Sequence, residues 1–415
     1  MRIAVWHNLP SGGGARAMQM HIDGLLARGH FIEVWGSNPT ASGFLTFPQS
    51  VNCHTVPLER SEAFSFRQQI ASCFFLEDSN LKAMKAHALQ CANEINAGDF
   101  DIVFLNSCFY YAAPLIAPYL EKPTVLYLGE PFRPFYEAQP NLLWQAPDFQ
   151  GIKWLRRSYW KSFWFDLYQI RKARVQVREE RKAIDAVNTL LLNSVFSQES
   201  TQRVYNRMGE VCYLGIDTSL FYPTYTLQNP DKPYVIGVGN LVFHKNASFA
   251  ITAISLIDKK HRPTLVWVSN MKEKKLVGEL KEQAKRLEVD FEIKEMIPDE
   301  LLITLLQGAS AMVYTSILEP FGLAPLEANA CGTPVVALRQ GGVRETILEG
   351  WNGFLCLSEK EMAQKIELLV RDKVLRQKMG EQSVKEIQQK WTVEAAITRF
   401  EEVLIKTVDH GSNVR

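Results

Sequence analysis

RIAVWHNLPSGGGARAMQMHIDGLLARGHFIEVWG, residues 2–36, decides the fold class. Its two ends, 2–7 and 31–36, are short apolar runs that are typical of buried strands. Between them, a glycine-rich loop leads into 12–30, where the apolar residues recur at helical spacing. A strand, a glycine loop, a helix and a second strand make the βαβ unit of a parallel sheet, so the sequence predicts an α/β protein.

The same alternation continues along the chain in two runs. The first run adds apolar strands at 100–106, 123–129 and 189–194. The second run alternates strands expected at 233–240, 263–270, 290–297, 310–316 and 333–338 with helices expected at 247–257, 272–289 and 299–309. Two such runs predict two doubly wound, Rossmann-like domains joined by a connector at 221–233. Ligands bind at the carboxyl ends of parallel strands, so we expect the site in a central cleft between the domains.

The composition excludes several classes of protein. Of 415 residues, 47% are apolar and 22% are charged, and the net charge of +1 gives no overall field for nucleic acid. The seven cysteines show no CxxC spacing and the eight histidines no HExxH spacing, so we expect reduced thiols and no metal site. No signal-peptide pattern is present, and no segment reaches the roughly 20 apolar residues of a spanning helix. These features predict a cytoplasmic protein that at most lies on the inner face of a membrane.

Residues 151–182 break the alternation. They contain ten basic and three acidic residues, interleaved with seven aromatic ones. One interpretation is a helical excursion whose aromatic residues pack on the first domain. The other is a basic and aromatic surface that contacts an anionic membrane or a lipid-linked acceptor. Both interpretations stay open from the sequence.

SILEPFGLAPLEANACGTPVVA, residues 316–337, carries the strongest functional signal. It places Glu319 and Glu327 eight positions apart on the two sides of a turn broken by proline and glycine. Proline is tolerated at the first position of a helix, so we expect a helix that starts at Pro325 and is closed by Gly332. Glu327 would then lie in the first turn and Glu319 in the loop before it.

The backbone before this helix suits an anion. The amides of Phe321, Gly322 and Leu323 lie just upstream of the expected start, where a helix carries roughly half a positive charge. Carboxylates beside a bound anion would accept hydrogen bonds from hydroxyl groups, and an anion flanked by hydroxyls describes a nucleotide-sugar. The alternative is that Glu327 merely complements the helix dipole and that Glu319 is a turn residue.

The Glu319–Glu327 spacing resembles the E-x7-E motif of the group 1 (family 4) retaining glycosyltransferases, which have the GT-B fold. Further blocks follow the order of that family: residues 9–36, LLLNSVFSQES followed by YLGIDTSLFYP, IGVGNLVFHKN (236–246) and GGVRETILEGWNGFL (341–355). The resemblance covers most of the chain. It implies an acceptor-side domain at 1–212, a nucleotide-sugar-binding domain at 213–390, and a last helix within 391–415 that returns to the first domain.

The resemblance implies catalytic roles for Glu319 and Lys245. Glu319 would bind the hydroxyls of the donor sugar, and Glu327 those of the ribose. Lys245 would neutralise the pyrophosphate, whose negative charge grows as the sugar leaves. For Lys245 alone, the alternative is a solvated loop charge.

Backbone groups complete the donor site that the resemblance implies. The amides of Phe321, Gly322 and Leu323 would lie near the sugar or the phosphate. Gly13 and Gly14 match the glycine loop that closes over the donor from the first domain, and a simple tight turn is the alternative for them.

The chain departs from the family pattern on the phosphate side. Asn240 stands where the family often has an arginine before the lysine. Lys245 would then carry more of the phosphate charge, or Arg16 or Arg339 would help.

The acceptor side departs further. Asn106 and Gly129 stand where the family often has histidines, so Asn106 or Glu130 would take over contacts with the sugar. The segment 129–137, which includes Arg133, lies where an acceptor or sugar loop is expected. The alternative for this segment is a proline-rich structural turn.

Together these features imply a retaining hexosyltransferase, as in polysaccharide biosynthesis. It would move a sugar from a UDP- or GDP-linked donor to a hydroxyl of a glycan, a lipid-linked molecule or a small molecule. No metal or other cofactor would be required, and the leaving phosphate would accept the proton of the incoming hydroxyl. Two alternatives remain: a GT-B nucleotide-sugar epimerase or phosphorylase, and a non-catalytic scaffold that binds a nucleotide-sugar.

Overall fold

The chain divides into two compact units. The computed structural model describes residues 1–9, 12–37, 45–59, 70, 73–74, 79–137, 157–224 and 232–412. The first unit comprises Met1–Asn193, Gln198–Cys212 and Ile397–Arg415, and the second comprises Ser194–Ser197 and Tyr213–Ala396. The division therefore passes within two helices, α6 (Val195–Tyr205) and α14 (Val393–Ser412).

The first unit is built on a seven-stranded parallel sheet in the order β3-β2-β1-β4-β5-β6-β7. The strands are β1 (Arg2–His7), β2 (Phe31–Gly36), β3 (Asn52–Thr55), β4 (Ile102–Asn106), β5 (Thr124–Tyr127), β6 (Thr189–Leu192) and β7 (Glu210–Val211). The other elements of this unit are α1 (Gly13–Ala27), α3 (Ser79–Ala97), η1 (Ala117–Tyr119), α4 (Arg133–Tyr136) and α5 (Arg157–Ala186), together with most of α6 and α14.

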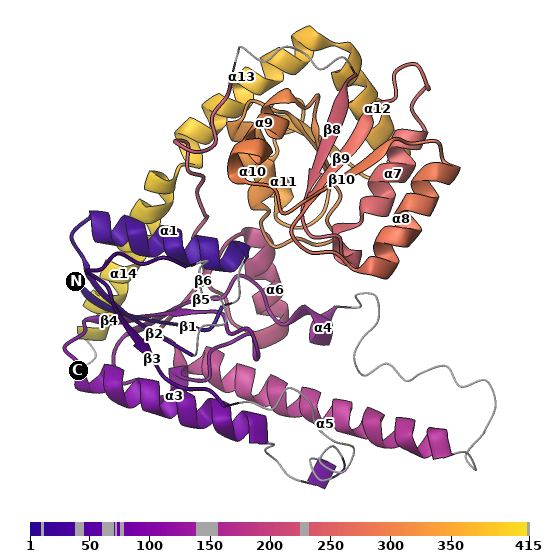
Figure 1. Ribbon diagram of the computed structural model, residues 1–415. Coiled ribbons are helices and arrows are strands. Elements are labelled where there is room, and N and C mark those ends of the chain that lie inside the picture. The colour runs from indigo at the N-terminus through magenta and orange to yellow at the C-terminus, as the bar shows by residue number, and fades with distance from the viewer. Residues whose placement is uncertain are drawn as a thin grey trace. The chain divides into compact units, whose positions relative to one another are not determined.

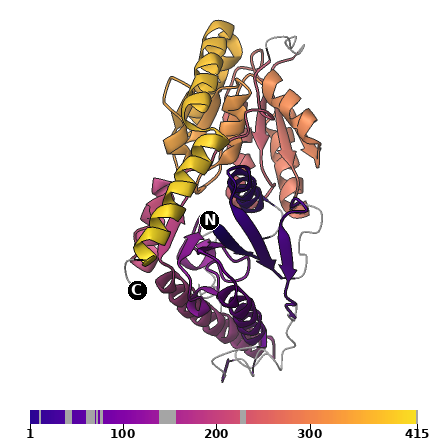
Figure 2. The same ribbon diagram turned by 90° about the vertical axis from the view of Figure 1, so that its left-hand side faces the viewer.

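Helices cover both faces of this sheet (Figures 1 and 2). On one face, the apolar side chains of α3 and the end of α5 pack on alternate residues of the strands, including Trp6 and Leu105. On the other face, His21 of α1 lies against the rings of Phe104 and Phe400, and Phe400 belongs to α14. The central strands β1, β4 and β5 therefore bury both of their faces, as expected for a doubly wound sheet.

The second unit repeats this plan with a six-stranded parallel sheet in the order β10-β9-β8-β11-β12-β13. Its strands are β8 (Tyr234–Val238), β9 (Thr264–Ser269), β10 (Phe291–Glu295), β11 (Met312–Tyr314), β12 (Val335–Leu338) and β13 (Gly353–Cys356). Its helices are η2 (Phe243–Lys245), α7 (Ala247–Ser255), α8 (Lys274–Arg286), α9 (Asp299–Gly308), α10 (Leu323–Ala330), α11 (Val343–Thr346), α12 (Glu359–Arg371) and α13 (Lys373–Lys390). The predicted α/β class with two doubly wound sheets is confirmed.

In both sheets the direction of winding reverses between two neighbouring strands. The reversal falls between β1 and β4 in the first unit and between β8 and β11 in the second. Connections leave such a pair of strands toward opposite faces, and the gap between them is where open α/β sheets bind ligands. The fold therefore marks one position in each unit before any side chain is considered.

Substitution of Gly24 should loosen the packing of α14 on α1. A methyl group at Gly24 would lie 2.6 Å from Cδ1 and 3.0 Å from Cγ2 of Ile397, closer than carbon atoms pack. We expect Gly24→Ala to lower the free energy of unfolding by about 1–3 kcal/mol in urea denaturation, the usual effect of overpacking. Gly278→Ala in α8 is the matched control, because nothing lies within 4 Å of its added methyl group. It should stabilise the protein by up to about 1 kcal/mol, and equal losses in both variants would contradict the close α1–α14 packing.

Candidate functional site

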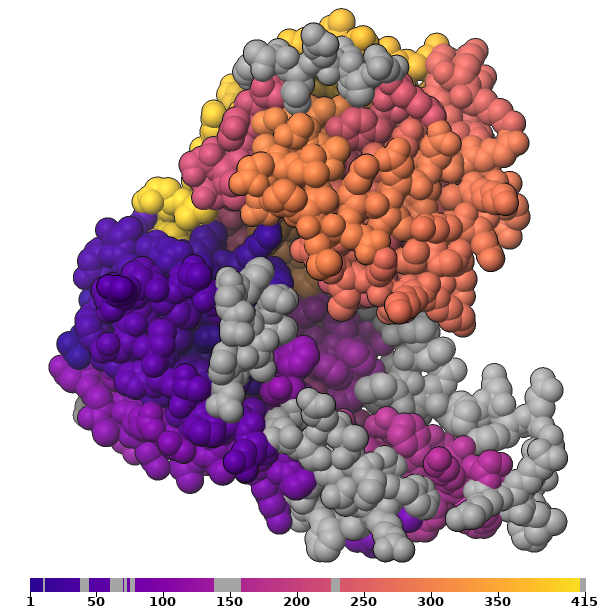
Figure 3. Space-filling view, viewed as in Figure 1, coloured from indigo at the N-terminus to yellow at the C-terminus, as the bar shows by residue number. Residues whose placement is uncertain are grey.

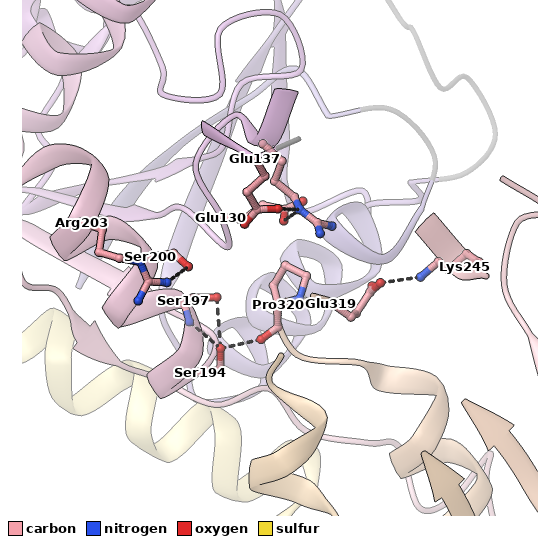
Figure 4. Close-up of polar contacts among 10 residues, drawn as sticks. Glu130, Glu137, Ser194, Ser197, Ser200, Arg203, Lys245, Glu319 and Pro320 are labelled. Atoms are coloured by element: carbon pink, nitrogen blue, oxygen red, sulfur yellow. Dashed lines mark hydrogen bonds and ion pairs between the residues drawn. The ribbon is translucent and has the colours of Figure 1, made fainter. Parts of the chain in front are cut away.

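The candidate site of the second unit centres on an ion pair between Lys245 and Glu319. Lys245 Nζ lies 2.7 Å from Glu319 Oε2, and the two side chains are 17% and 21% exposed (Figure 4). Lys245 ends η2, which follows β8, and Glu319 lies in the loop that follows β11. Because β8 and β11 flank the reversal of winding, the topology brings together two charges that are 74 positions apart in the sequence.

The segment that carries Lys245 is attached to the end of β11. Thr315 Oγ1 donates to the carbonyl of Lys245 at 2.9 Å, and the amide of Ile317 donates to the carbonyl of His244 at 2.7 Å. The aliphatic stem of Lys245 lies over Gly239, where an added Cβ would be 3.3 Å from Lys245 Cδ. Gly239 also has φ +148°. Both the close contact with Lys245 and this backbone conformation therefore favour glycine at this position.

The backbone on each side of the ion pair is in an unusual conformation. Asn246, directly after Lys245, has φ +53°, and Leu318, directly before Glu319, has φ +50°. Residues other than glycine reach this left-handed region at a cost of about 1–3 kcal/mol, and such strain is concentrated at functional sites. We infer that the two loops are shaped to hold Lys245 and Glu319 in position, even though the backbone strain lowers the stability of the fold.

The loop that carries Glu319 is held from two sides. The amide of Gly342 donates to the carbonyl of Glu319 at 2.8 Å, and Ser194 Oγ donates to the carbonyl of Pro320 (Figure 4). Gly341 and Gly342 pack so closely that a Cβ on either would overlap the backbone of Glu319 or Pro320. The paired glycines of the block at 341–355 thus fix the glutamate loop.

The helix after this loop starts earlier than predicted. It begins at Leu323, with Gly322 at φ +91° as its N-cap, so the predicted start at Pro325 is wrong by two residues. The first four N–H groups of a helix have no partner within it, so proline costs no hydrogen bond at the third position either. Glu327 consequently lies in the second turn and is 8% exposed. Gly332 follows the helix at φ +78°, the conformation of a closing glycine.

The start of α10 presents amides beside the ion pair. No residue in the described ranges accepts a hydrogen bond from the amides of Phe321, Gly322 or Leu323. The side chain of Phe321 is buried, with its ring centre 6.1 Å from that of Tyr213 and 5.9 Å from that of Trp391. A buried ring anchors the turn, which leaves its backbone to meet a ligand.

The other residues predicted for the phosphate side are spread over both units. Asn240 is half-buried and its carbonyl accepts from the amide of Val242 at 2.9 Å. Arg339 follows β12 and is exposed, as is Arg16 in the first unit. Gly13 and Gly14 are the first two residues of α1 and not part of a loop before it. The structure thus groups Lys245, Glu319 and the start of α10 most closely.

The residues predicted for the acceptor side lie at the carboxyl ends of β4 and β5 in the first unit. Asn106 ends β4 and is 4% exposed, and Gly129 follows β5 with φ +65°. Arg133 Nε lies 3.4 Å from Glu130 Oε2 and 2.8 Å from Glu137 Oε2, so two carboxylates balance its charge (Figure 4). This balance makes Arg133 a poor anion receptor.

Sequence reasoning missed the group that holds this acceptor-side segment. Glu180 of α5 is fully buried and accepts from Gln176 Nε2 at 3.0 Å, Tyr205 Oη at 3.1 Å and Tyr136 Oη at 3.3 Å. Burial raises the pKa of Glu180 from 4.5 to about 7, and burial also raises the pKa of both tyrosines, which remain donors. Tyr136 belongs to α4, so the cluster ties the 129–137 segment to α5 and α6. A polar residue on a buried helix face has no distinct sequence signal.

Glu180 should make the stability of the first unit depend on pH. Because its pKa is higher in the folded state than in the unfolded chain, its contribution is complete below about pH 4.5 and is lost as the pH rises through about 7. The loss should reach about 3 kcal/mol, at about 1.4 kcal/mol per pKa unit. Urea unfolding at mildly acidic and mildly alkaline pH should show this loss in the wild type and a smaller one in Glu180→Gln. The same pH dependence in both proteins would contradict the assignment.

Comparison with solved structures identifies the fold. Solved structures of similar architecture include Anabaena HepE in complex with UDP-glucose (TM-score 0.68, 19% identity, 98% of this chain and 100% of that one). They also include sucrose-phosphate synthase from Thermosynechococcus elongatus (TM-score 0.70, 16% identity, 98% of both chains). Such likeness establishes the fold, which is GT-B, as predicted.

The sequence comparisons match part of the chain to a family. Residues 224–386 match the family model described as glycosyl transferases group 1. N-acetyl-alpha-D-glucosaminyl L-malate synthase of Bacillus anthracis is 26% identical over 241 residues, which are 57% of this chain and 62% of that protein. Alpha-maltose-1-phosphate synthase of Mycolicibacterium smegmatis is 25% identical over 224 residues, 46% of this chain and 56% of that protein. The chain thus spans about three fifths of the length of the curated relatives it matches, and the match to the group 1 glycosyltransferase family falls within its second unit.

Proposed function

We propose that the chain is a retaining glycosyltransferase that moves a sugar from a nucleoside-diphosphate sugar to a hydroxyl of an acceptor. The observation that carries the proposal is the Lys245–Glu319 ion pair beside the open amides at the start of α10. The family match supports a sugar-transfer reaction. The UDP and UDP-glucose complexes of HepE favour a uridine donor over a guanosine one.

In this proposal the donor binds along the second unit. Lys245 and the amides of Gly322 and Leu323 meet the diphosphate, since both supply positive charge without a bound metal. Glu319 accepts hydrogen bonds from sugar hydroxyls and Glu327 from the ribose. In the absence of donor, Glu319 holds the ammonium group of Lys245 in place, so little reorganisation is needed when the diphosphate arrives.

The chemistry then rests on charge and position. As the bond between the sugar and the diphosphate breaks, negative charge accumulates on the leaving phosphate. Lys245, already fixed by its neighbours, stabilises that charge, and groups placed in advance do this best. The leaving phosphate takes the proton of the incoming hydroxyl on the same face of the sugar, which gives retention. No metal or other cofactor enters this account.

Lys245→Ala should lose the response to nucleotide while staying folded. In the wild type, UDP at a hundredfold excess over its dissociation constant should add about 2.7 kcal/mol to the free energy of unfolding, seen as a higher melting temperature. We expect this gain to shrink sharply in Lys245→Ala and Glu327→Ala, and transfer from UDP-glucose to fall by about 10²–10³-fold in Lys245→Ala.

Lys275→Ala is the control for this experiment, because Lys275 is an exposed lysine of α8. It should behave like the wild type. Wild-type turnover in Lys245→Ala would overturn the site assignment. UDP binding without turnover would favour the scaffold, and a free or phosphorylated sugar from labelled UDP-glucose would favour an epimerase or phosphorylase.

Helix α5 supports a second proposal, a peripheral contact with an anionic membrane. The first interpretation of 151–182, aromatic residues packed on the first domain, holds for Tyr168, which is buried, but is wrong for Trp160, Phe163 and Phe165, which are 44–48% exposed. Lys161, Lys172 and Arg174 are exposed on the same helix, part of which is visible at the surface in Figure 3. Residues 151–156, including Trp154, lie outside the described residues.

Exposed aromatic and basic groups on one helix suit the interface of a bilayer that contains anionic lipid. No helix in the described part of the chain is long and apolar enough to cross a bilayer. The contact proposed here is therefore one in which α5 lies along the surface.

A vesicle experiment tests this contact. The protein should sediment with vesicles of phosphatidylcholine and phosphatidylserine but not with phosphatidylcholine alone, and salt should weaken the binding because the attraction is partly electrostatic. The double variant Trp160→Ala/Phe163→Ala should bind several-fold less. Trp351→Ala, which removes an exposed tryptophan of the second unit, serves as control. Equal binding of all three proteins would exclude α5 as the contact.

A further inference from the structure

Two polar side chains lie where the winding of the first sheet reverses. The proposed chemistry gives neither of them a defined role. His7 ends β1 and Asn106 ends β4, and the two strands are parallel neighbours. The register pairs Trp6 with Leu105, so His7 and Asn106 are the next pair along. Residues paired in parallel strands project to the same face of the sheet, which puts the two side chains side by side.

Both side chains contain a buried polar atom that has no partner. Nδ1 of His7 and Nδ2 of Asn106 make no hydrogen bond to any residue within the described ranges. Buried polar groups in folded proteins are almost always paired, so each unpaired one needs a reason. Two of them at the end of two adjacent strands, where α/β sheets bind ligands, point to one common ligand group.

The loops beside this position are tied to each other. Asn8, directly after β1, donates from Nδ2 to Cys108 Sγ at 3.2 Å and accepts at Oδ1 from the amide of Phe109 at 3.0 Å. These bonds connect the loop after β1 to the loop after β4, next to His7 and Asn106.

A second histidine, His21, provides a comparison with a purely structural role. His21 Nε2 is also buried and unpaired within the described part of the chain. Its ring, however, lies 4.3 Å from that of Phe400 and 5.1 Å from that of Tyr127, inside the core and away from the strand ends. His21 fills space between α1 and α14, whereas His7 lies at the carboxyl end of the central strand β1, with its ring centre 6.5 Å from that of Phe47.

The chemistry of the pair defines the ligand group. Burial lowers the pKa of His7 from 6.5 to about 4, so its imidazole is neutral at physiological pH. In the tautomer that carries its proton on Nε2, the neutral imidazole accepts one hydrogen bond at Nδ1, and an amide Nδ2 donates one. A neutral hydroxyl both donates and accepts, whereas a phosphate or a carboxylate can only accept and would leave Nδ1 of His7 unpaired.

We propose that His7 and Asn106 form a hydroxyl-binding subsite for the acceptor, in which a polyol or sugar hydroxyl donates to His7 Nδ1 and accepts from Asn106 Nδ2. The assignment to the acceptor rests on the proposed glycosyltransferase function. It makes the acceptor group bound here neutral, and it adds His7 to a site for which sequence reasoning offered Asn106, Gly129, Glu130 and Arg133.

Ligand-observed saturation-transfer NMR on the full chain tests the subsite with defined probes. The wild type should bind methyl α-D-glucoside or methyl α-D-mannoside in the presence of UDP, and bind glucose 6-phosphate no better than these. His7→Phe and Asn106→Leu should each weaken binding of the neutral glycoside by about tenfold, the effect of one lost hydrogen bond to a neutral group that leaves its partner unpaired. His54→Phe is the matched control, because His54 belongs to the same unit and stacks on Trp35, which phenylalanine can also do.

Monodeoxy analogues of the bound glycoside, each of which lacks one hydroxyl group, test the subsite on the wild type even if a variant folds poorly. One analogue should bind the wild type about tenfold more weakly and should lose no further affinity in His7→Phe. Failure of the wild type to bind any neutral glycoside, or unchanged binding in both variants, would overturn the subsite. The UDP-induced rise in melting temperature should be the same in all of these proteins. If UDP has no effect on any of them while His7→Phe still loses the glycoside, the proposed function fails and the subsite stands.

Discussion

The ion pair between Lys245 and Glu319 is the interaction on which the account of this protein depends. A largely buried pair of this kind is weak evidence for stability, because the cost of desolvation offsets its attraction, yet several features of the chain hold it in place. Asn246 and Leu318 adopt left-handed backbone conformations beside it. Gly341 and Gly342 lie so close to the backbone of Glu319 and Pro320 that neither glycine position has room for a Cβ. The proposed function explains this arrangement by position rather than stability, because a lysine that is to meet a diphosphate has to be in place before the charge develops.

The sheet topology explains why the two charges meet at all. In each unit the winding reverses between two adjacent strands, and the polar residues of interest follow those strands. In the second unit these residues are Lys245 and Glu319, which combine opposite charges. In the first unit they are His7 and Asn106, which combine a neutral acceptor and a neutral donor. The same geometric rule thus underlies both proposals, the site for a charged donor and the subsite for an uncharged hydroxyl.

Sequence reasoning succeeded where one local pattern determines the structure. The run at 31–36 is β2, as predicted, because a short, mainly apolar run next to a glycine turn favours a buried strand. It missed β3, whose sequence NCHT has no apolar run, and it placed the start of α10 two residues late, because proline is acceptable at several first-turn positions. Glu180 and His7 were missed for another reason. Their significance comes from burial and unpaired or shared hydrogen bonds, which arise only when distant segments pack.

A double-mutant cycle on the affinity for UDP-glucose, measured by calorimetry, tests the central claim most directly. Lys245→Gln and Glu319→Gln remove the two charges without removing bulk. If the pair acts as one unit toward the donor, the loss in the double variant should differ from the sum of the single losses by about 0.5–3 kcal/mol, as for residues in contact within one site. Losses that simply add, or single variants that bind UDP-glucose like the wild type, would contradict the claim.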